Sequence, residues 1–78
     1  MDETEQAILQ LLNARDAGKT ICPSEAARRL NPGNWRERMP EVRATAAALA
    51  EQGRVAITQG GAVADPQTLV GPWRIRLP

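Results

Sequence analysis

The 78-residue sequence contains no histidine, phenylalanine or tyrosine, and only one cysteine. Without histidine, the Cys–His and Ser–His–Asp arrangements that activate catalytic nucleophiles are excluded. One cysteine and no histidine also argue against a zinc site, and Cys22 has no second cysteine with which to form an internal disulfide. We therefore expect no metal and no cofactor, and we predict that the protein is not an enzyme.

Long apolar runs are missing as well. No stretch of eighteen apolar residues is present, so no membrane span is predicted. Residues 1–6 are acidic and lack the basic and apolar regions of a secretory signal. A single free thiol without a targeting segment is typical of the reducing cytoplasm, which is the predicted location.

Charge is unevenly distributed, although the net charge is only +1. Residues 1–18 carry a net charge of −3, whereas residues 19–43 carry +3. Nine of the ten basic residues are arginine, which can pair with phosphate through two hydrogen bonds. A basic middle segment suggests an anionic partner, but it is also compatible with an ordinary solvated surface.

The strongest helix signal covers residues 40–53. Pro40 suits the first position of a helix, alanine dominates the interior, and Gly53 is typical of a left-handed helix end. Helical spacing places Val42, Ala46 and Leu49 on the core face. The opposite face then carries Ala44, Ala47, Ala48 and Glu51.

Two helices are predicted before this one. The first covers residues 4–17, ends at Gly18, and places Ile8, Leu11, Leu12 and Arg15 on one face. A short strand over residues 19–22 follows. The second helix begins at Pro23 and ends at Leu30, with either Cys22 or Ser24 as its cap. A single helical turn over residues 35–38 precedes Pro40.

Strand patterns dominate the C-terminal third. Residues 54–59 and 73–77 alternate as half-buried strands do, and Gly60-Gly61 favours a turn rather than a phosphate-binding loop. Residues 62–71 read as a loop. The predicted fold is a small α+β winged helix-turn-helix: one domain over residues 1–78, with three helices and a C-terminal β-hairpin as the wing.

Several motifs together resemble a bacterial family of uncharacterised domains. The segments that carry the resemblance are residues 18–25 (GKTICPSE), Trp35-Arg36, Met39-Pro40, Val42-Arg43, Ile57-Thr58-Gln59, Asp65-Pro66 and Gly71-Pro72. The resemblance covers most of the chain, and it implies a small winged-helix-like fold. It implies no activity and no site residue, because this family has no established function.

The arginines are the main candidates for a binding site, with double-stranded DNA as the predicted partner. One group surrounds the turn between the second and third helices, and another can line the wing; in winged helices these two regions straddle DNA. The candidates are Arg28, Arg36, Arg38 and Arg43, together with Arg54, Arg74 and Arg76. Contacts to phosphate of this kind provide affinity without sequence specificity.

An alternative is a protein-interaction or dimerisation module that uses the outer face of the third helix. Ala44, Ala47, Ala48 and Glu51 offer little to base edges, which are read by Arg, Lys, Asn or Gln. A smooth apolar helix face is instead suited to another protein. The two tryptophans, Trp35 and Trp73, are expected to pack in the core.

Cys22 raises a third hypothesis, a redox role. Its position near a helix start favours the thiolate. A buried or capping cysteine explains the same position more simply.

Overall fold

A computed structural model describes residues 2–16, 18–69 and 71–78. The predicted small α+β class is confirmed, with three α-helices and a four-stranded antiparallel sheet in the described part of the chain. The elements in order are α1 (Glu3–Asn13), β1 (Thr20–Ile21), α2 (Pro23–Leu30), the 3₁₀ turn η1 (Trp35–Arg38), α3 (Met39–Glu51), β2 (Ala56–Gln59), β3 (Ala62–Val63) and β4 (Arg74–Arg76).

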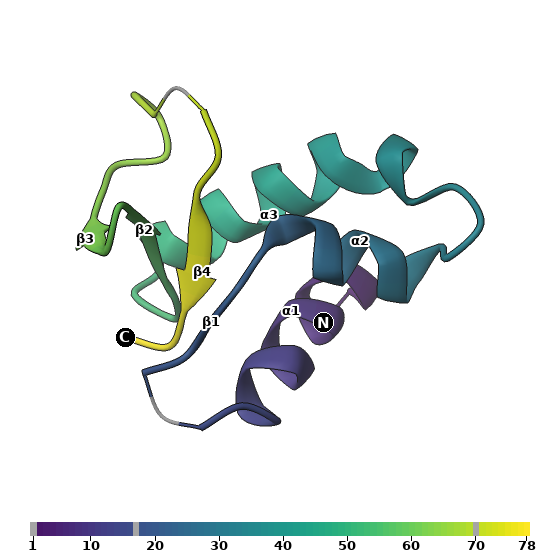
Figure 1. Ribbon diagram of the computed structural model, residues 1–78, viewed down its shortest axis with the longest axis horizontal. Coiled ribbons are helices and arrows are strands. Elements are labelled where there is room, and N and C mark those ends of the chain that lie inside the picture. The colour runs from purple at the N-terminus through teal and green to yellow at the C-terminus, as the bar shows by residue number, and fades with distance from the viewer. Residues whose placement is uncertain (1, 17, 70) are drawn as a thin grey trace.

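The sheet has the strand order β1-β4-β2-β3. The last strand of the chain therefore lies inside the sheet, where Ile75 of β4 is paired with Ile21 of β1 on one side and with Ile57 of β2 on the other. In Figure 1, α3 runs along the length of the molecule, with α2 beside one part of it and the sheet beside another. The pairing of β1 with β4 connects the segment between the first two helices to the C-terminus.

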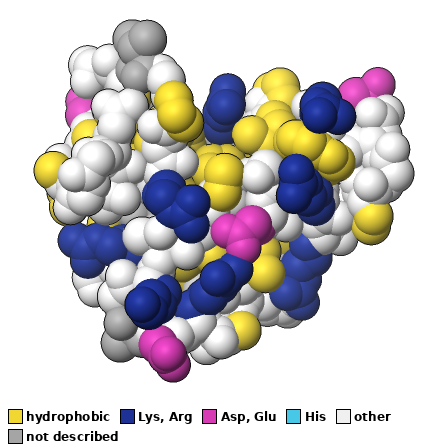
Figure 2. Space-filling model, in the orientation of Figure 1, with side chains coloured by type: hydrophobic (Ala, Val, Ile, Leu, Met, Phe, Trp, Pro, Cys, Tyr) yellow, Lys and Arg dark blue, Asp and Glu magenta, His cyan; other side chains and the backbone are white. Residues whose placement is uncertain are grey.

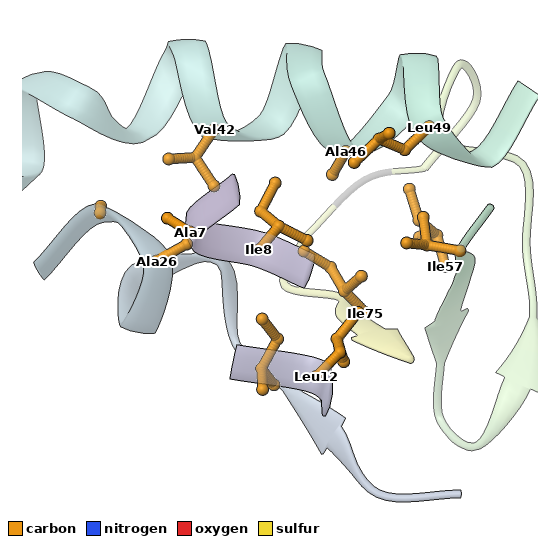
Figure 3. Packing of buried hydrophobic residues seen from close by; sticks show 12 residues of the cluster. Ala7, Ile8, Leu12, Ala26, Val42, Ala46, Leu49, Ile57 and Ile75 are labelled. Atoms are coloured by element: carbon orange, nitrogen blue, oxygen red, sulfur yellow. The ribbon is translucent and has the colours of Figure 1, made fainter. Parts of the chain in front are cut away.

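One hydrophobic core joins the helices to the sheet. Ile8 and Leu12 of α1, Leu49 of α3, and Ile75 of β4 are at most 1% exposed, and Figure 3 shows their side chains converging between α1, α3 and the strands. Burial of one such side chain contributes about 1.5–3 kcal/mol. The predicted core face of α3 is confirmed, since its three residues Val42, Ala46 and Leu49 are fully buried.

The first helix is shorter than predicted. It begins after Asp2, whose Oδ1 accepts a hydrogen bond of 2.9 Å from the N–H of Glu5, and it ends at Asn13. The predicted continuation to residue 16 is wrong, and the predicted last residue, Ala17, lies outside the described residues. After Leu12 the side chains at 13–16 are all exposed, including Arg15, which was expected on the buried face. Most of the stability of a helix in a protein comes from burial of its apolar face, so the helix ends where that face ends.

The second helix begins as predicted, with Cys22 at the cap position and Pro23 in the first turn. The carboxylate of Glu25 accepts a hydrogen bond of 2.7 Å from the N–H of Cys22. Of the two cap residues left open by the sequence, Cys22 is therefore correct. Glu25 also pairs with Arg15, so it connects the start of α2 to the segment that follows α1.

The predicted loop over residues 62–71 is wrong at its start. Residues Ala62–Val63 form β3, which pairs with β2 across a two-residue turn. Gly60 and Gly61 both have positive φ, 61° and 85°, which this kind of tight hairpin turn requires. The predicted pairing of the two longer strands is confirmed as the antiparallel β2–β4 ladder.

Gly53 ends α3 in the left-handed conformation, as predicted. Its φ is 74°, and the N–H of Arg54 reaches back to the carbonyl of Leu49 at 2.9 Å. The N–H of Gly53 donates to the carbonyl of Ala50 at 3.0 Å. This pair of bonds satisfies carbonyls that the end of the helix leaves open.

We expect Gly53→Ala to lower the free energy of unfolding by about 1–2 kcal/mol, because an L side chain resists a left-handed backbone. A methyl group there would contact nothing within 4 Å, so the cost is conformational alone. Urea unfolding followed by tryptophan fluorescence measures it. The control is Gly33→Ala, whose φ is not positive; an equal loss in both variants would contradict this account.

Glu41 connects α3 to α1. Its Oε2 accepts a hydrogen bond from the buried hydroxyl of Thr4 and another, at 3.0 Å, from Arg38. The bond from Thr4 and then the bond from Arg38 hold the pKa of Glu41 below its ordinary value of 4.5. Because the pKa is lower in the folded state, ionised Glu41 contributes stability above the unfolded pKa, and this is lost as the pH falls through the folded pKa.

We therefore expect Glu41→Gln to destabilise the protein near neutral pH by on the order of 1 kcal/mol or less, since the side chain is partly exposed. The difference from the wild type should shrink as the pH falls below about 4. Urea unfolding at neutral and at acidic pH tests this. Glu51→Gln is the matched control, and it should not destabilise the protein, because Glu51 lies at the C-terminal end of α3.

Candidate functional site

A groove of about 580 Å³ lies beside α3. One wall is the outer face of α3, with Arg43, Ala44, Ala47, Ala48 and Glu51. The other wall is the segment before β4, with Pro66, Gln67, Leu69, Gly71 and Trp73. In Figure 2 the surface is hollowed at its upper edge, with hydrophobic side chains at the base and Lys or Arg beside it.

The structure thus brings the predicted outer face of α3 together as one surface, and adds a second wall to it. Ala47 is half-buried in this groove, while Ala44, Ala48 and Glu51 are exposed. Arg43 and Glu51 are eight residues apart, which corresponds to about 12 Å along a helix. This wall of the groove therefore has a positive and a negative end, with a smooth alanine surface between them.

Trp35 is the centre of a second feature, at the junction of α2 and η1. The guanidinium carbons of Arg28 and of Arg36 each lie 4.5 Å from the centroid of its ring. Contacts of this geometry are attractive cation–π interactions. Trp35 is half-buried against the core rather than enclosed in it, and the same holds for Trp73. The expectation that both tryptophans lie in the core is therefore only partly correct.

The seven candidate arginines differ in what they contact. Arg38 pairs with Glu41 at 3.0 Å, and Arg54 pairs with Glu5 at 3.7 Å. In contrast, no carboxylate partner within the described residues is found for Arg28, Arg36 or Arg43.

Arg74 and Arg76 lie on the face of β4 opposite to Ile75, but β4 is an inner strand rather than the edge of a two-stranded wing. Arg74 donates to the hydroxyl of Thr20 at 2.5 Å and lies 4.0 Å from Glu25. Arg76 is half-buried and donates to the carbonyl of Leu77 at 3.4 Å. Both side chains thus have partners within the protein, and the partner of Arg74 is available because β1 lies alongside β4.

Cys22 is half-buried, and its Sγ accepts a hydrogen bond of 3.2 Å from the hydroxyl of Ser24. Its position as the cap of α2 supports the structural reading of this residue. The redox hypothesis stays a prediction.

Sequence reasoning missed the second wall of the groove and the stacked pair around Trp35. Most of this wall comes from a segment predicted as a loop, and nothing in its sequence indicates that it lies against α3. The stack had a weak signal, since Trp35 and Arg36 are adjacent and Arg28 is seven residues earlier, but only the turn between α2 and η1 brings them together.

Two further findings concern ligands and membranes. Among residues 2–16, 18–69 and 71–78, no three Cys, Asp or Glu side chains come together in a group that could hold a metal ion. None of the helices described combines the length and the apolar character needed to cross a membrane.

The model of a family described as protein of unknown function (DUF3253) matches residues 1–78, so the chain belongs to this family. The predicted membership of a family without an established function is confirmed. A comparison with curated proteins finds no match.

Proposed function

We propose that this member of the DUF3253 family is a winged helix-turn-helix module that binds double-stranded DNA through arginine–phosphate contacts and carries out no catalysis. The observation that carries the proposal is that three of the seven candidate arginines are exposed and have no carboxylate partner in the described chain: Arg28, Arg36 and Arg43. All three lie on α2, η1 and α3, the consecutive elements that would form the helix-turn-helix.

The topology supports the winged-helix assignment. A short strand between the first two helices pairs with the last strand of the chain, which lies beside the strand that follows α3. The segment between β3 and β4 would then be the wing. It forms one wall of the groove whose other wall is α3, so the proposed recognition helix and wing face the same space.

The chemistry of this surface favours affinity over specificity. The α3 wall formed by Ala44, Ala47 and Ala48 can contact a thymine methyl group but offers no side-chain hydrogen bonds to base edges. Glu51 would repel a phosphate at its end of the groove. Binding should therefore depend on phosphate contacts and weaken with salt. The plot of log K against log salt should have a slope of about one unit per phosphate contact. Arg38, Arg54, Arg74 and Arg76 rank second in this proposal, because they already have partners within the protein. Such a role fits the predicted cytoplasmic location and an origin in bacteria.

Replacement of Arg36 or Arg43 by alanine should weaken binding of a random-sequence duplex about equally for all sequences, and should reduce the slope of log K against log salt by about one unit. Fluorescence anisotropy of a labelled duplex, from low to physiological salt, measures both quantities. The matched control is Arg29→Ala, which removes the same charge from an arginine that instead donates to Gln10 at 2.8 Å. Wild-type protein that fails to bind the duplex even at low salt would exclude the proposal.

A second candidate function is self-association through the same groove. The specific observation is that Arg43 and Glu51 lie at opposite ends of the smooth alanine surface of α3. Two copies of α3 packed antiparallel would place each Arg43 opposite the Glu51 of the other copy. Symmetric dimers require a self-complementary surface of this kind.

For this second candidate, Ala47→Glu should abolish the dimer, because it places an unpaired charge in the middle of the contact. Sedimentation velocity over a range of concentrations measures the oligomeric state. Ala62→Glu adds the same charge at an exposed position of β3 and should leave the dimer intact. Wild-type protein that stays monomeric at about millimolar concentration would reject this candidate, since a weaker dimer has little biological use.

A further inference from the structure

Trp35 holds together two arginines from different elements. Arg28 belongs to α2 and Arg36 to η1, and each guanidinium carbon lies 4.5 Å from the centre of the indole ring. Trp35 itself is partly buried against the hydrophobic core. The ring is therefore held in place by the core, whereas Arg28 and Arg36 are exposed to solvent.

The stacking leaves the guanidinium groups available for a ligand. A cation–π contact uses the flat face of the group, while its N–H donors point outward from the edge. An unsupported arginine side chain loses much rotamer freedom when it binds, and an arginine already held against a ring loses less. Arg28 and Arg36 are in this sense prepared for binding before a ligand arrives.

The charges of this pair are also uncompensated. Each carbon lies 4.5 Å from the same point, so the two are at most about 9 Å apart, which is close to the Debye length at physiological salt, about 8 Å. Neither has a carboxylate partner in the described residues, whereas Arg38 on the same turn is paired with Glu41. At this separation salt screens the repulsion between the two positive charges only in part. An anionic group beside both of them would therefore be attracted to each and would reduce their repulsion.

We propose that Trp35 is a positioning residue that holds Arg28 and Arg36 as a preformed clamp for two neighbouring phosphate groups. Planar guanidinium groups match phosphate oxygens with paired hydrogen bonds, and two such groups this close can engage successive phosphates of one nucleic-acid strand. This inference rests on the proposed function and deepens it. The same chemistry would also hold the two phosphates of free pyrophosphate, which allows the clamp to be tested without DNA.

The test follows the two indole N–H signals of the protein by ¹H–¹⁵N NMR, with duplex DNA or sodium pyrophosphate as the probe and sodium sulfate at equal ionic strength as the control. We expect both probes to shift the Trp35 signal, with Trp73 as the internal reference for the pyrophosphate arm. Sulfate should shift it much less. An equal response to an oligomer of glutamate would overturn the assignment to phosphate.

Three variants separate positioning from a general effect on the fold. Trp35→Leu keeps apolar bulk against the core but removes the ring; it should weaken duplex binding about tenfold and lower the salt slope by more than one unit, although both arginines remain. Trp35→Phe keeps a flat ring and should restore most of the binding. The double variant Arg28→Lys/Arg36→Lys changes only exposed positions, keeps both charges, and should lose most of the pyrophosphate response.

The outcomes for the clamp and for the proposed function are distinct. If the duplex is not bound but pyrophosphate still shifts Trp35 in the wild type and not in the double lysine variant, the clamp stands and the DNA proposal fails. If the duplex is bound through Arg43 and Trp35→Leu binds as well as the wild type, the clamp is wrong and the DNA proposal stands. Should Trp35→Leu fail to fold, equal binding of both probes by the wild type and the double lysine variant would overturn the clamp.

Discussion

The pairing of β4 with both β1 and β2 is the constraint on which the rest of the structure depends. Ile75 is fully buried between Ile21 and Ile57, and the same core includes Ile8 of α1 and Leu49 of α3. A three-residue strand has few hydrogen bonds of its own, so its position depends on this burial. Once β4 is inside the sheet, the chain before it must pass across the outside of the molecule, where it forms the second wall of the groove beside α3.

The same strand pairing helps to determine which arginines have partners within the protein. Because β1 lies beside β4, Thr20 is available to Arg74, and Glu25 at the start of α2 comes within 4.0 Å of it. Similarly, α1 packs against α3, and this packing brings Thr4 to Glu41. Glu41 in turn is the partner of Arg38. Of the candidate arginines, those that are exposed and have no carboxylate partner in the described chain lie on α2, η1 and α3. Positive charge that the fold does not neutralise is the part of the surface most open to an anionic ligand.

The local elements could largely be predicted from the sequence, and the site could be predicted only in part. The start of α2 at Pro23, the turn at Gly60-Gly61 and the end of α3 at Gly53 follow from residue types that favour one backbone conformation. The end of α1 could not be found in this way, because the residue types at 13–16 are compatible with a helix. The helix ends at Asn13 because the side chains that follow are not buried. The strand β3 was missed because two residues form a strand here only through pairing with β2.

For this protein, the sequence by itself determined the number and order of the helices, the buried face of α3, the absence of histidine chemistry and the arginine-rich character of the basic residues. These properties depend on composition and on spacing along one element. Only the tertiary structure decided which arginines are neutralised, that Arg28 and Arg36 share one indole ring, and that the alanine face of α3 is a wall of a groove rather than an open surface. Each of these depends on residues far apart in the chain or on a turn between elements, and such distances are determined by packing of the core.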